Sequence, residues 1–238
     1  MWNRLLGLIA LGALSGAPAS AAGPGAPGPS FSCAAGLNAT EALVCRDGEL
    51  SAYDRAMAAA RARTWRSSGY GWQGQRDWLA RRNACGADRA CILDLYRRWI
   101  EGLEIESAPR SNFRRIVSPG PDGEMILGTL QSPTGEVISL DEDADMFIHP
   151  LGGGWYLFRG SSIYTYDPHD GRGSNVSTGE ATGLVHIVRG KGLYRADPDM
   201  EHGCTLHFTQ LPRGRWKVEE EHACSGLGAT MTGIYARR

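Results

Sequence analysis

The chain has 238 residues, of which 25 are basic and 26 acidic, so its formal net charge at pH 7 is −1. This near balance argues against a nucleic-acid-binding protein, because such proteins typically have a strong excess of basic residues. The length is sufficient for one large or two small globular domains.

The N-terminus has the three-part layout of a secretory signal peptide over residues 1–22. Arg4 supplies a positive start, an apolar run covers residues 5–14, and small residues offer a cleavage site near Ala21 and Ala22. The apolar run is too short for a transmembrane helix, which needs about 20 apolar residues. We therefore expect an exported protein, periplasmic or secreted, without a transmembrane segment. Residues 23–30, rich in Gly and Pro, are predicted to be a flexible leader.

Six cysteines follow the predicted signal peptide. An even number of cysteines in an exported chain is typical of a disulfide framework, and six cysteines allow fifteen pairings. We favour the nearest-neighbour pairing, because each such pair lies inside one local unit. The pairs are Cys33 with Cys45, Cys85 with Cys91, and Cys204 with Cys224.

Residues 31–107 are predicted to form a helical domain stapled by the first two disulfides. Thr40 is a candidate cap for the first helix, and Asp88 for the last. Between them, apolar residues recur at helical spacing, for example at Leu50, Tyr53 and Met57. Core positions are expected at Trp78, Leu79, Tyr96 and Trp99. The arginines are expected to form a solvated face, namely Arg61, Arg63, Arg66, Arg76, Arg81, Arg82, Arg97 and Arg98.

Several short motifs follow one another in this half, between residues 29 and 106. They are PSFSC ending at Cys33, TEALVC ending at Cys45, LSAYD ending at Asp54, QRDWL and RNAC within residues 75–85, and ACILDLY ending at Tyr96. In this order they resemble the N-terminal domain of the LprI-type lysozyme inhibitors. The short, glycine-rich segment at residues 67–74 departs from the family pattern. The resemblance implies an envelope protein with a stapled helical fold that can inhibit lysozyme.

Residues 112–238 contain short β-prone runs separated by Gly- and Pro-rich turn signals, a pattern typical of an antiparallel barrel or sandwich. The predicted fold class is therefore α+β, with an N-terminal disulfide-stapled helical hairpin or bundle followed by an antiparallel β-barrel or sandwich. The predicted strands lie within residues 116–117, 125–130, 137–140, 146–148, 155–158, 163–166, 184–188, 193–194, 205–208, 216–218 and 230–235.

The sequence lacks the common catalytic motifs G-x-S-x-G and H-E-x-x-H. Asp141, Asp143 and Asp145 begin like a calcium loop, but Met146 stands where the turn glycine belongs. Three histidines near the last two cysteines suggest zinc, yet oxidised cysteines cannot bind it. We expect no metal, no cofactor and no enzymatic activity.

Two clusters are candidate partner-binding residues. Ser161, Ser162 and Tyr164 faintly resemble the Ser- and Tyr-bearing loop that β-barrel lysozyme inhibitors insert into the cleft of the enzyme. Asp141, Asp143 and Asp145 could steer a basic partner towards the protein, or could simply form a solvated turn.

The predicted function is non-catalytic binding of a protein partner, with lysozyme inhibited by occlusion of its cleft. One alternative is an envelope module that binds cell-wall glycan or another periplasmic protein, which exposed aromatics such as Trp155 or Tyr166 would favour. A second alternative is an uncharacterised hydrolase, which needs a deep pocket with converging carboxylates or histidines.

Overall fold

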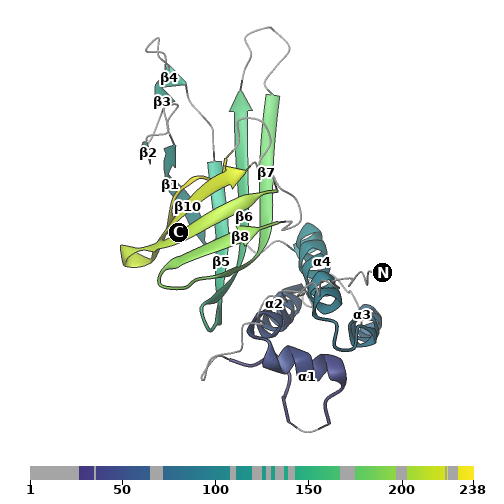
Figure 1. The fold of residues 1–238 in the computed structure, drawn as a ribbon. Helices are drawn as coiled ribbons and strands as arrows, with labels where there is room; N and C mark the ends of the chain where they lie inside the picture. The colour runs from purple at the N-terminus through teal and green to yellow at the C-terminus, as the bar shows by residue number, and fades with distance from the viewer. Residues whose placement is uncertain are drawn as a thin grey trace, which may run out of the picture.

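The computed structural model describes residues 27–34, 36–64, 72–107, 111–119, 125–126, 130–131, 137–138, 143–166, 175–196, 203–222, 224 and 230–238. The predicted signal peptide lies outside these residues. Four helices form the N-terminal half: α1 (Ala39–Arg46), α2 (Gly48–Thr64), α3 (Trp72–Ala84) and α4 (Arg89–Ser107). They group together beside one end of a large sheet (Figure 1).

The C-terminal half is made of strands and one 3₁₀ turn, η1 (Pro212–Gly214). The strands are β1 (Phe113–Pro119), β2 (Met125–Ile126), β3 (Leu130–Gln131), β4 (Val137–Ile138), β5 (Asp143–Gly152), β6 (Trp155–Tyr166), β7 (Asn175–His186), β8 (Lys191–Arg195), β9 (Thr205–Leu211), β10 (Arg215–His222) and β11 (Gly233–Arg237).

The main sheet is antiparallel, and its neighbours follow the order β7-β6-β5-β1-β11-β10-β9-β8, with β2 paired to β1. β3 and β4 form a separate pair. The large sheet curls into a nearly closed, barrel-like form, which confirms the predicted α+β class (Figure 1).

Two predicted strands, at residues 155–158 and 163–166, are one continuous strand, β6. Gly160, Ser161 and Ser162 do not break it, because each pairs with β5 on one side and with β7 on the other. β7 also begins nine residues earlier than the predicted run at 184–188. The sequence pattern missed the first part of the strand because it is rich in Ser, Thr and Gly and lacks the apolar alternation of a typical strand.

The first helix is capped by Asn38 and not, as predicted, by Thr40. The Asn38 side chain accepts a hydrogen bond from the backbone N–H of Glu41, whose carboxylate accepts from the Asn38 N–H. This reciprocal arrangement is a capping box. Thr40 is instead buried, and its hydroxyl donates to the carbonyl of Asn83 near the end of α3 and, at 2.7 Å, to that of Gly86 in the following turn. Thr40 therefore joins α1 to the turn that follows α3.

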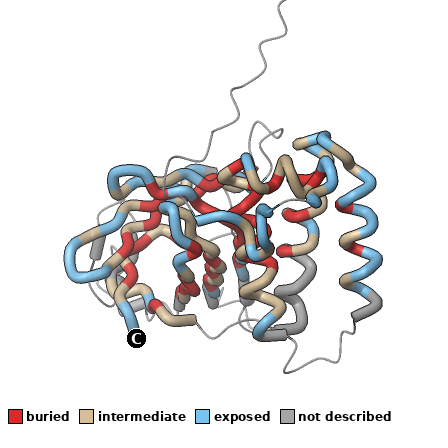
Figure 2. Tube along the Cα trace, turned by 90° about the horizontal axis from the view of Figure 1, so that it is seen from below, coloured by how far each residue is buried: buried red, intermediate tan, exposed pale blue. Residues whose placement is uncertain are grey.

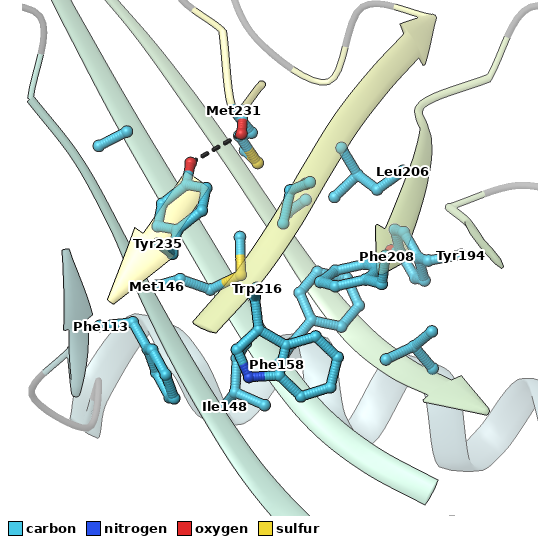
Figure 3. Close-up of a cluster of buried hydrophobic side chains, with 14 of the residues drawn as sticks. Phe113, Met146, Ile148, Phe158, Tyr194, Leu206, Phe208, Trp216, Met231 and Tyr235 are labelled. Atoms are coloured by element: carbon cyan, nitrogen blue, oxygen red, sulfur yellow. Dashed lines mark hydrogen bonds between the residues drawn. The ribbon is translucent and has the colours of Figure 1, made fainter. Parts of the chain in front are cut away.

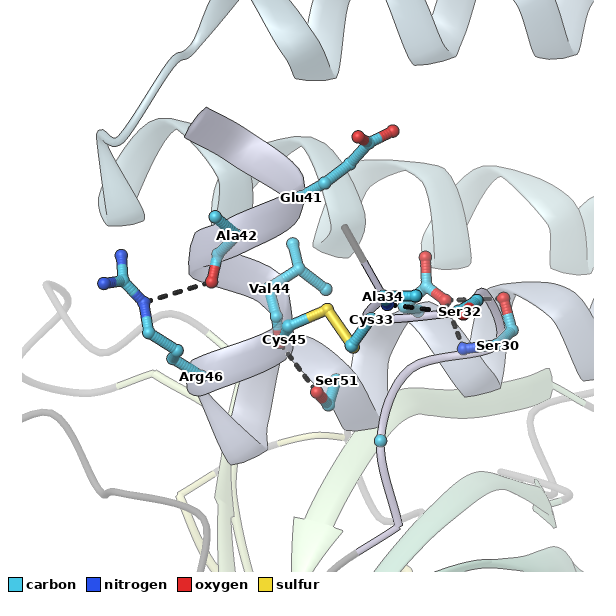
Figure 4. The surroundings of a disulfide bond; sticks show 12 residues. Ser30, Ser32, Cys33, Ala34, Glu41, Ala42, Val44, Cys45, Arg46 and Ser51 are labelled. Carbon is cyan, nitrogen blue, oxygen red and sulfur yellow. Dashed lines mark hydrogen bonds between the residues drawn. A yellow bond between two sulfur atoms is a disulfide. The ribbon is translucent and has the colours of Figure 1, made fainter. Parts of the chain in front are cut away.

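Three disulfides pair the six cysteines as nearest neighbours. Cys33–Cys45 fixes the N-terminal segment to α1 (Figure 4), Cys85–Cys91 spans the turn between α3 and α4, and Cys204–Cys224 joins the flanks of the β9–β10 hairpin. Such a set indicates an extracellular or otherwise oxidising compartment. None of the helices in the described part of the chain is long and apolar enough to span a bilayer.

The helices are organised around a buried carboxylate, that of Asp54 in α2. One of its oxygens accepts a hydrogen bond from the Tyr96 hydroxyl at 2.8 Å and lies 3.6 Å from a guanidinium nitrogen of Arg82. The other accepts from the backbone N–H and the hydroxyl of Ser30, at 2.7 and 2.5 Å. Burial, together with the charge of Asp54, raises the pKa of Tyr96 well above its ordinary value. The phenol therefore keeps its proton and acts as a donor.

Arg82 corrects the expectation of a solvated arginine face, because its side chain is only 3% exposed. It donates to the Tyr96 hydroxyl at 3.2 Å, and its guanidinium lies over the rings of Phe31 and Trp78. A charge this deeply buried is tolerated because Asp54 compensates it. Arg76, Arg81 and Arg98 are exposed, as expected.

The predicted leader also differs from expectation at its end. The carbonyls of Pro27 and Gly28 accept hydrogen bonds from Arg55 of α2, and Ser30 is bound to Asp54. Residues 27–30 therefore run along the helical half as a held segment.

An aromatic and aliphatic core fills the inside of the curled sheet (Figure 3). Phe158 packs against Phe208 and Tyr194, with ring centroids 4.8 and 4.7 Å apart. The fully buried Tyr235 donates its hydroxyl to the Met231 carbonyl at 2.7 Å, which ties the last strand to the segment before it.

A second core lies between the helices and the outer face of β5, β6 and β7. Leu151 and Leu184 are buried in the same cluster as the helical core residues, and Leu157 packs against it. Arg55 of α2 adds a polar link by donating to the Leu151 carbonyl at 2.7 Å. Buried positions therefore run through the sheet and continue into the helices beside it (Figure 2).

We predict that Tyr96→Phe lowers the free energy of unfolding by about 1.5–3 kcal/mol, since it removes a buried hydrogen bond to a charged group. Chemical denaturation followed by circular dichroism measures this loss. Tyr156→Phe is the matched control, because the Tyr156 hydroxyl accepts an exposed hydrogen bond from Gln210 and its loss should change stability little. Equal losses in both variants would contradict the central role of the Asp54 network.

Candidate functional site

The barrel-like sheet has one seam, where its two end strands, β7 and β8, meet. These strands are connected by a tight turn in which Arg189 and Gly190 have φ of 53° and 80°. That left-handed pair suits a two-residue hairpin turn. The described backbone pairing between the two arms, however, is limited to a bridge between Val188 and Lys191. Beyond this bridge the strands diverge.

A tyrosine closes the seam in place of backbone hydrogen bonds. Tyr194 of β8 reaches across to β7, and its hydroxyl donates to the Thr182 carbonyl at 2.7 Å. The ring lies directly over Gly183, where an added Cβ would be 2.3 Å from a ring carbon. Position 183 must therefore be glycine for the ring to lie this close to β7.

Where the strands diverge, a groove of about 230 Å³ lies between the seam and the helices. We call it the seam groove. Its helical wall comes from α2 and α4, its floor from β7, and its outer wall from β8. The lining residues are Glu49, Tyr53, Arg97, Ile100, Trp155, Thr182, Gly183, Leu184, His186, Leu193, Tyr194, Arg195 and Ala196.

Aromatic side chains occupy one end of the seam groove. Trp155 and His186 face each other on paired strands and stack with their rings 4.5 Å apart and inclined by 9°. A His186 ring nitrogen lies 3.2 Å from the Gly153 carbonyl, which fixes the orientation of the imidazole. Trp155 also packs against the core beneath the helices. This end of the groove is therefore preformed and rigid.

Charged groups lie on both walls. Arg97 of α4 is half-buried and donates through Nε to the Tyr53 hydroxyl at 3.4 Å. Burial alone would lower the pKa of Arg97, but this bond and the nearby Glu49 outweigh burial and raise the pKa. Arg195 is exposed on the opposite wall. Leu193, 45% exposed, lies beside it as an apolar patch.

A second hollow lies on the outer face of β8, β9 and β10. Two of its acidic lining residues are paired: a Glu221 oxygen lies 2.8 Å from a ring nitrogen of His207, and Glu219 lies 2.6 Å from Lys217 beside the hollow. Among the described residues, no group of three His, Cys, Asp or Glu side chains is placed to hold a metal ion. The seam groove is the better candidate site, because it lies between two layers and keeps guanidinium groups available.

The predicted serine cluster lies within strand β6. Ser161 pairs with Asp145 and Glu180, and Ser162, which is 1% exposed, pairs with Ala144 and Gly179. Tyr164 belongs to the same strand. These residues therefore belong to a paired strand and not to a loop, and neither Ser161 nor Ser162 lines the seam groove.

The acidic cluster also differs from the expected solvated turn. Asp143 and Asp145 lie in β5, beside the serine cluster on β6. Both oxygens of Asp145 lie 2.6 Å from a guanidinium nitrogen of Arg238, so its charge is compensated. Asp141 lies outside the described residues. Of this cluster, Asp145 is thus poorly suited to steer a basic partner.

Sequence reasoning missed most of the seam groove. The sequence indicates only helical spacing for Tyr53 and predicts a solvated position for Arg97, and it does not single out His186 or Arg195 as binding residues. One signal was available: alternation along Lys191–Arg195 places Leu193 and Arg195 on the same outward face. That face combines an exposed leucine with an arginine.

Comparisons with protein-family models, with curated proteins and with solved structures find no match for this chain. The site must therefore be interpreted from its own chemistry.

We predict that Gly183→Ala destabilises the protein by about 1–3 kcal/mol, since the new methyl group would displace the Tyr194 ring. Thermal and chemical unfolding measure the loss. Gly74→Ala in α3 is the control: nothing lies within 4 Å of its added Cβ, and alanine favours a helix by up to about 1 kcal/mol. The two variants should therefore shift stability in opposite directions. If Gly183→Ala left the stability unchanged, the proposed closure of the seam by Tyr194 would be contradicted.

Proposed function

We propose that the protein is an exported, non-enzymatic binding module that holds a cell-wall glycan in the seam groove. The observation that carries this proposal is the pairing of aromatic and apolar side chains with available hydrogen-bond donors in one rigid groove. Sugars present apolar ring faces together with many hydroxyl groups, and a site for them needs both kinds of contact.

The size of the groove supports a ligand that is only partly enclosed. At about 230 Å³, it is smaller than the roughly 300–1,000 Å³ of typical pockets for small molecules. A single sugar ring with its substituent suits that space, and the remainder of a glycan chain can continue over the open outer wall at Leu193.

The chemistry of the lining supports binding over hydrolysis. Glycoside hydrolysis generally uses a pair of carboxyl groups on either side of the scissile bond. Glu49 is the single carboxylate among the described lining residues, and Arg89 holds it by an ion pair. The uncharacterised-hydrolase alternative therefore has little support in this groove.

The covalent framework supports the same proposal. Disulfides and the Asp54 network hold α2 and α4 in place, so the helical wall is formed before a ligand arrives. Preorganisation of this kind reduces the ordering cost of association. The oxidising compartment that the disulfides indicate is also where cell-wall glycan is found.

We predict that Ala196→Trp abolishes binding, because Ala196 is an exposed lining residue and a bulky side chain there fills the groove without disturbing a core. Isothermal titration of the mature protein with soluble oligosaccharides of N-acetylglucosamine and N-acetylmuramic acid measures the affinity. Val188→Trp is the matched control, since Val188 is 56% exposed and lies outside the groove. Unchanged affinity in Ala196→Trp would place the glycan elsewhere.

Lysozyme binding is the second candidate, and it rests on the resemblance to the LprI-type inhibitors. Polar residues from three of the resembling motifs, Asp54, Arg82 and Tyr96, meet in one buried network. This convergence supports the proposal that the helical half shares its fold with these inhibitors, because residues from separate motifs contact one another. It leaves the inhibitory surface unassigned.

We predict that, if this second candidate holds, the mature protein slows lysis of bacterial cell walls by chicken-type, invertebrate-type or goose-type lysozyme in proportion to its concentration. The Ala196→Trp variant separates the two candidates. Inhibition that survives this substitution belongs to another surface, whereas inhibition that disappears with glycan binding reflects shielding of the substrate. Full lysis at a large excess of protein would end the inhibitor proposal.

A further inference from the structure

We infer that the seam groove recognises a carboxylate on its sugar ligand, through Arg97 and Arg195. This inference rests on the proposed glycan-binding function and specifies the class of glycan. The ligand would be an acidic sugar, such as the lactyl-bearing residue of peptidoglycan or a uronic acid. Neutral chitin-like oligosaccharides would bind more weakly.

The first observation concerns the unused donors of Arg97. Its Nε is bound to the Tyr53 hydroxyl, which fixes the plane of the guanidinium. Its two terminal nitrogens have no hydrogen-bond partner among the residues that the structure describes. Because Arg97 is only half-buried, these donors remain open to water and can be offered to a ligand. A planar fork of N–H groups matches the two oxygens of a carboxylate.

The second observation concerns Arg195 on the facing wall. It follows Tyr194, the residue that closes the seam, so the position of its backbone is fixed by that contact. Within the described part of the chain, Arg195 forms no hydrogen bond or ion pair. Two other exposed arginines do have such partners, since Arg98 pairs with Asp94 and Arg238 with Asp145. What distinguishes Arg195 is therefore its place on the wall of the seam groove, opposite Arg97.

The third observation is the balance of charge in the groove. Glu49 is the one acidic residue among the described lining residues. Arg89 forms an ion pair with it and a second ion pair, at 2.7 Å, with Asp47. Burial opposes the charge on Arg89, but its bonds to the two carboxylates outweigh burial and raise its pKa. Among the described lining residues, the positive charges of Arg97 and Arg195 are therefore left in excess. A groove with such an excess concentrates anions.

The geometry favours a carboxylate on a sugar over a free inorganic anion. The two arginines share the groove with Leu193, Ile100 and the Trp155–His186 stack, so a bound anion has an apolar surface beside it. A small hydrated ion gains nothing from that surface, whereas a sugar ring does.

The test compares matched acidic and neutral sugars by isothermal titration at constant ionic strength. The probes are N-acetylglucosaminyl-N-acetylmuramic acid with a free lactyl carboxylate, its methyl ester, a galacturonic acid disaccharide, and the neutral disaccharide of N-acetylglucosamine. We expect the free acid to bind at least about tenfold more tightly than its ester. Arg195→Gln and Arg97→Gln should each reduce this preference by about tenfold, and Arg98→Gln on the same helix should leave it unchanged.

The outcomes separate this inference from the function on which it rests. Equal binding of acid and ester would overturn the carboxylate inference and leave the glycan function standing. Failure of all four probes to bind would overturn both. Preference for the muramic or the galacturonic probe identifies the source of the carboxylate, and either preference supports the inference. Because Arg97 is half-buried, the exposed Arg195 provides the variant least able to disturb the fold.

Discussion

The buried carboxylate of Asp54 is the constraint around which the helical half is built. It receives hydrogen bonds from Ser30 in the N-terminal segment and Tyr96 in α4, and it lies beside Arg82 of α3. A buried charge is strongly destabilising when a partner is missing. The charge of Asp54 is therefore compensated only when the N-terminal segment, α3 and α4 are all packed against α2. Asp54 thus constrains the tertiary arrangement of these elements.

This constraint extends to the sheet and shapes the seam groove. Helices α2 and α4, fixed to each other by Asp54 and Tyr96, lie over the outer face of β5 and β7 through a shared apolar core. Arg55, next to Asp54 in the chain, donates to the Leu151 carbonyl and links the helices directly to β5. Since Tyr53 and Arg97 belong to the same helices, one wall of the groove is positioned by the network that stabilises the fold.

The sequence predicted local features well and tertiary features poorly. Helix periodicity, the disulfide pairs and most strand centres depend on neighbours in the chain. Arg82 was misassigned because its partners lie in other helices, and an arginine in a helical pattern gives no sign of burial. The predicted division of β6 into two strands was wrong for a similar reason. Ser161 and Ser162 have low strand propensity, but pairing with strands on both sides outweighs it. The groove exists only where β7, β8, α2 and α4 meet, which no local pattern encodes.

The placement of charge distinguishes the structural arginines from the candidate functional ones. Arg82, Arg89 and Arg238 each face a carboxylate, and each joins separate segments of the chain. Such pairs contribute to the unique arrangement of the fold. Arg97 and Arg195 lie on opposite walls of one groove. Among its described lining residues Glu49 is the one carboxylate, and it is already paired with Arg89. The described part of the groove therefore suits a ligand that brings its own negative charge.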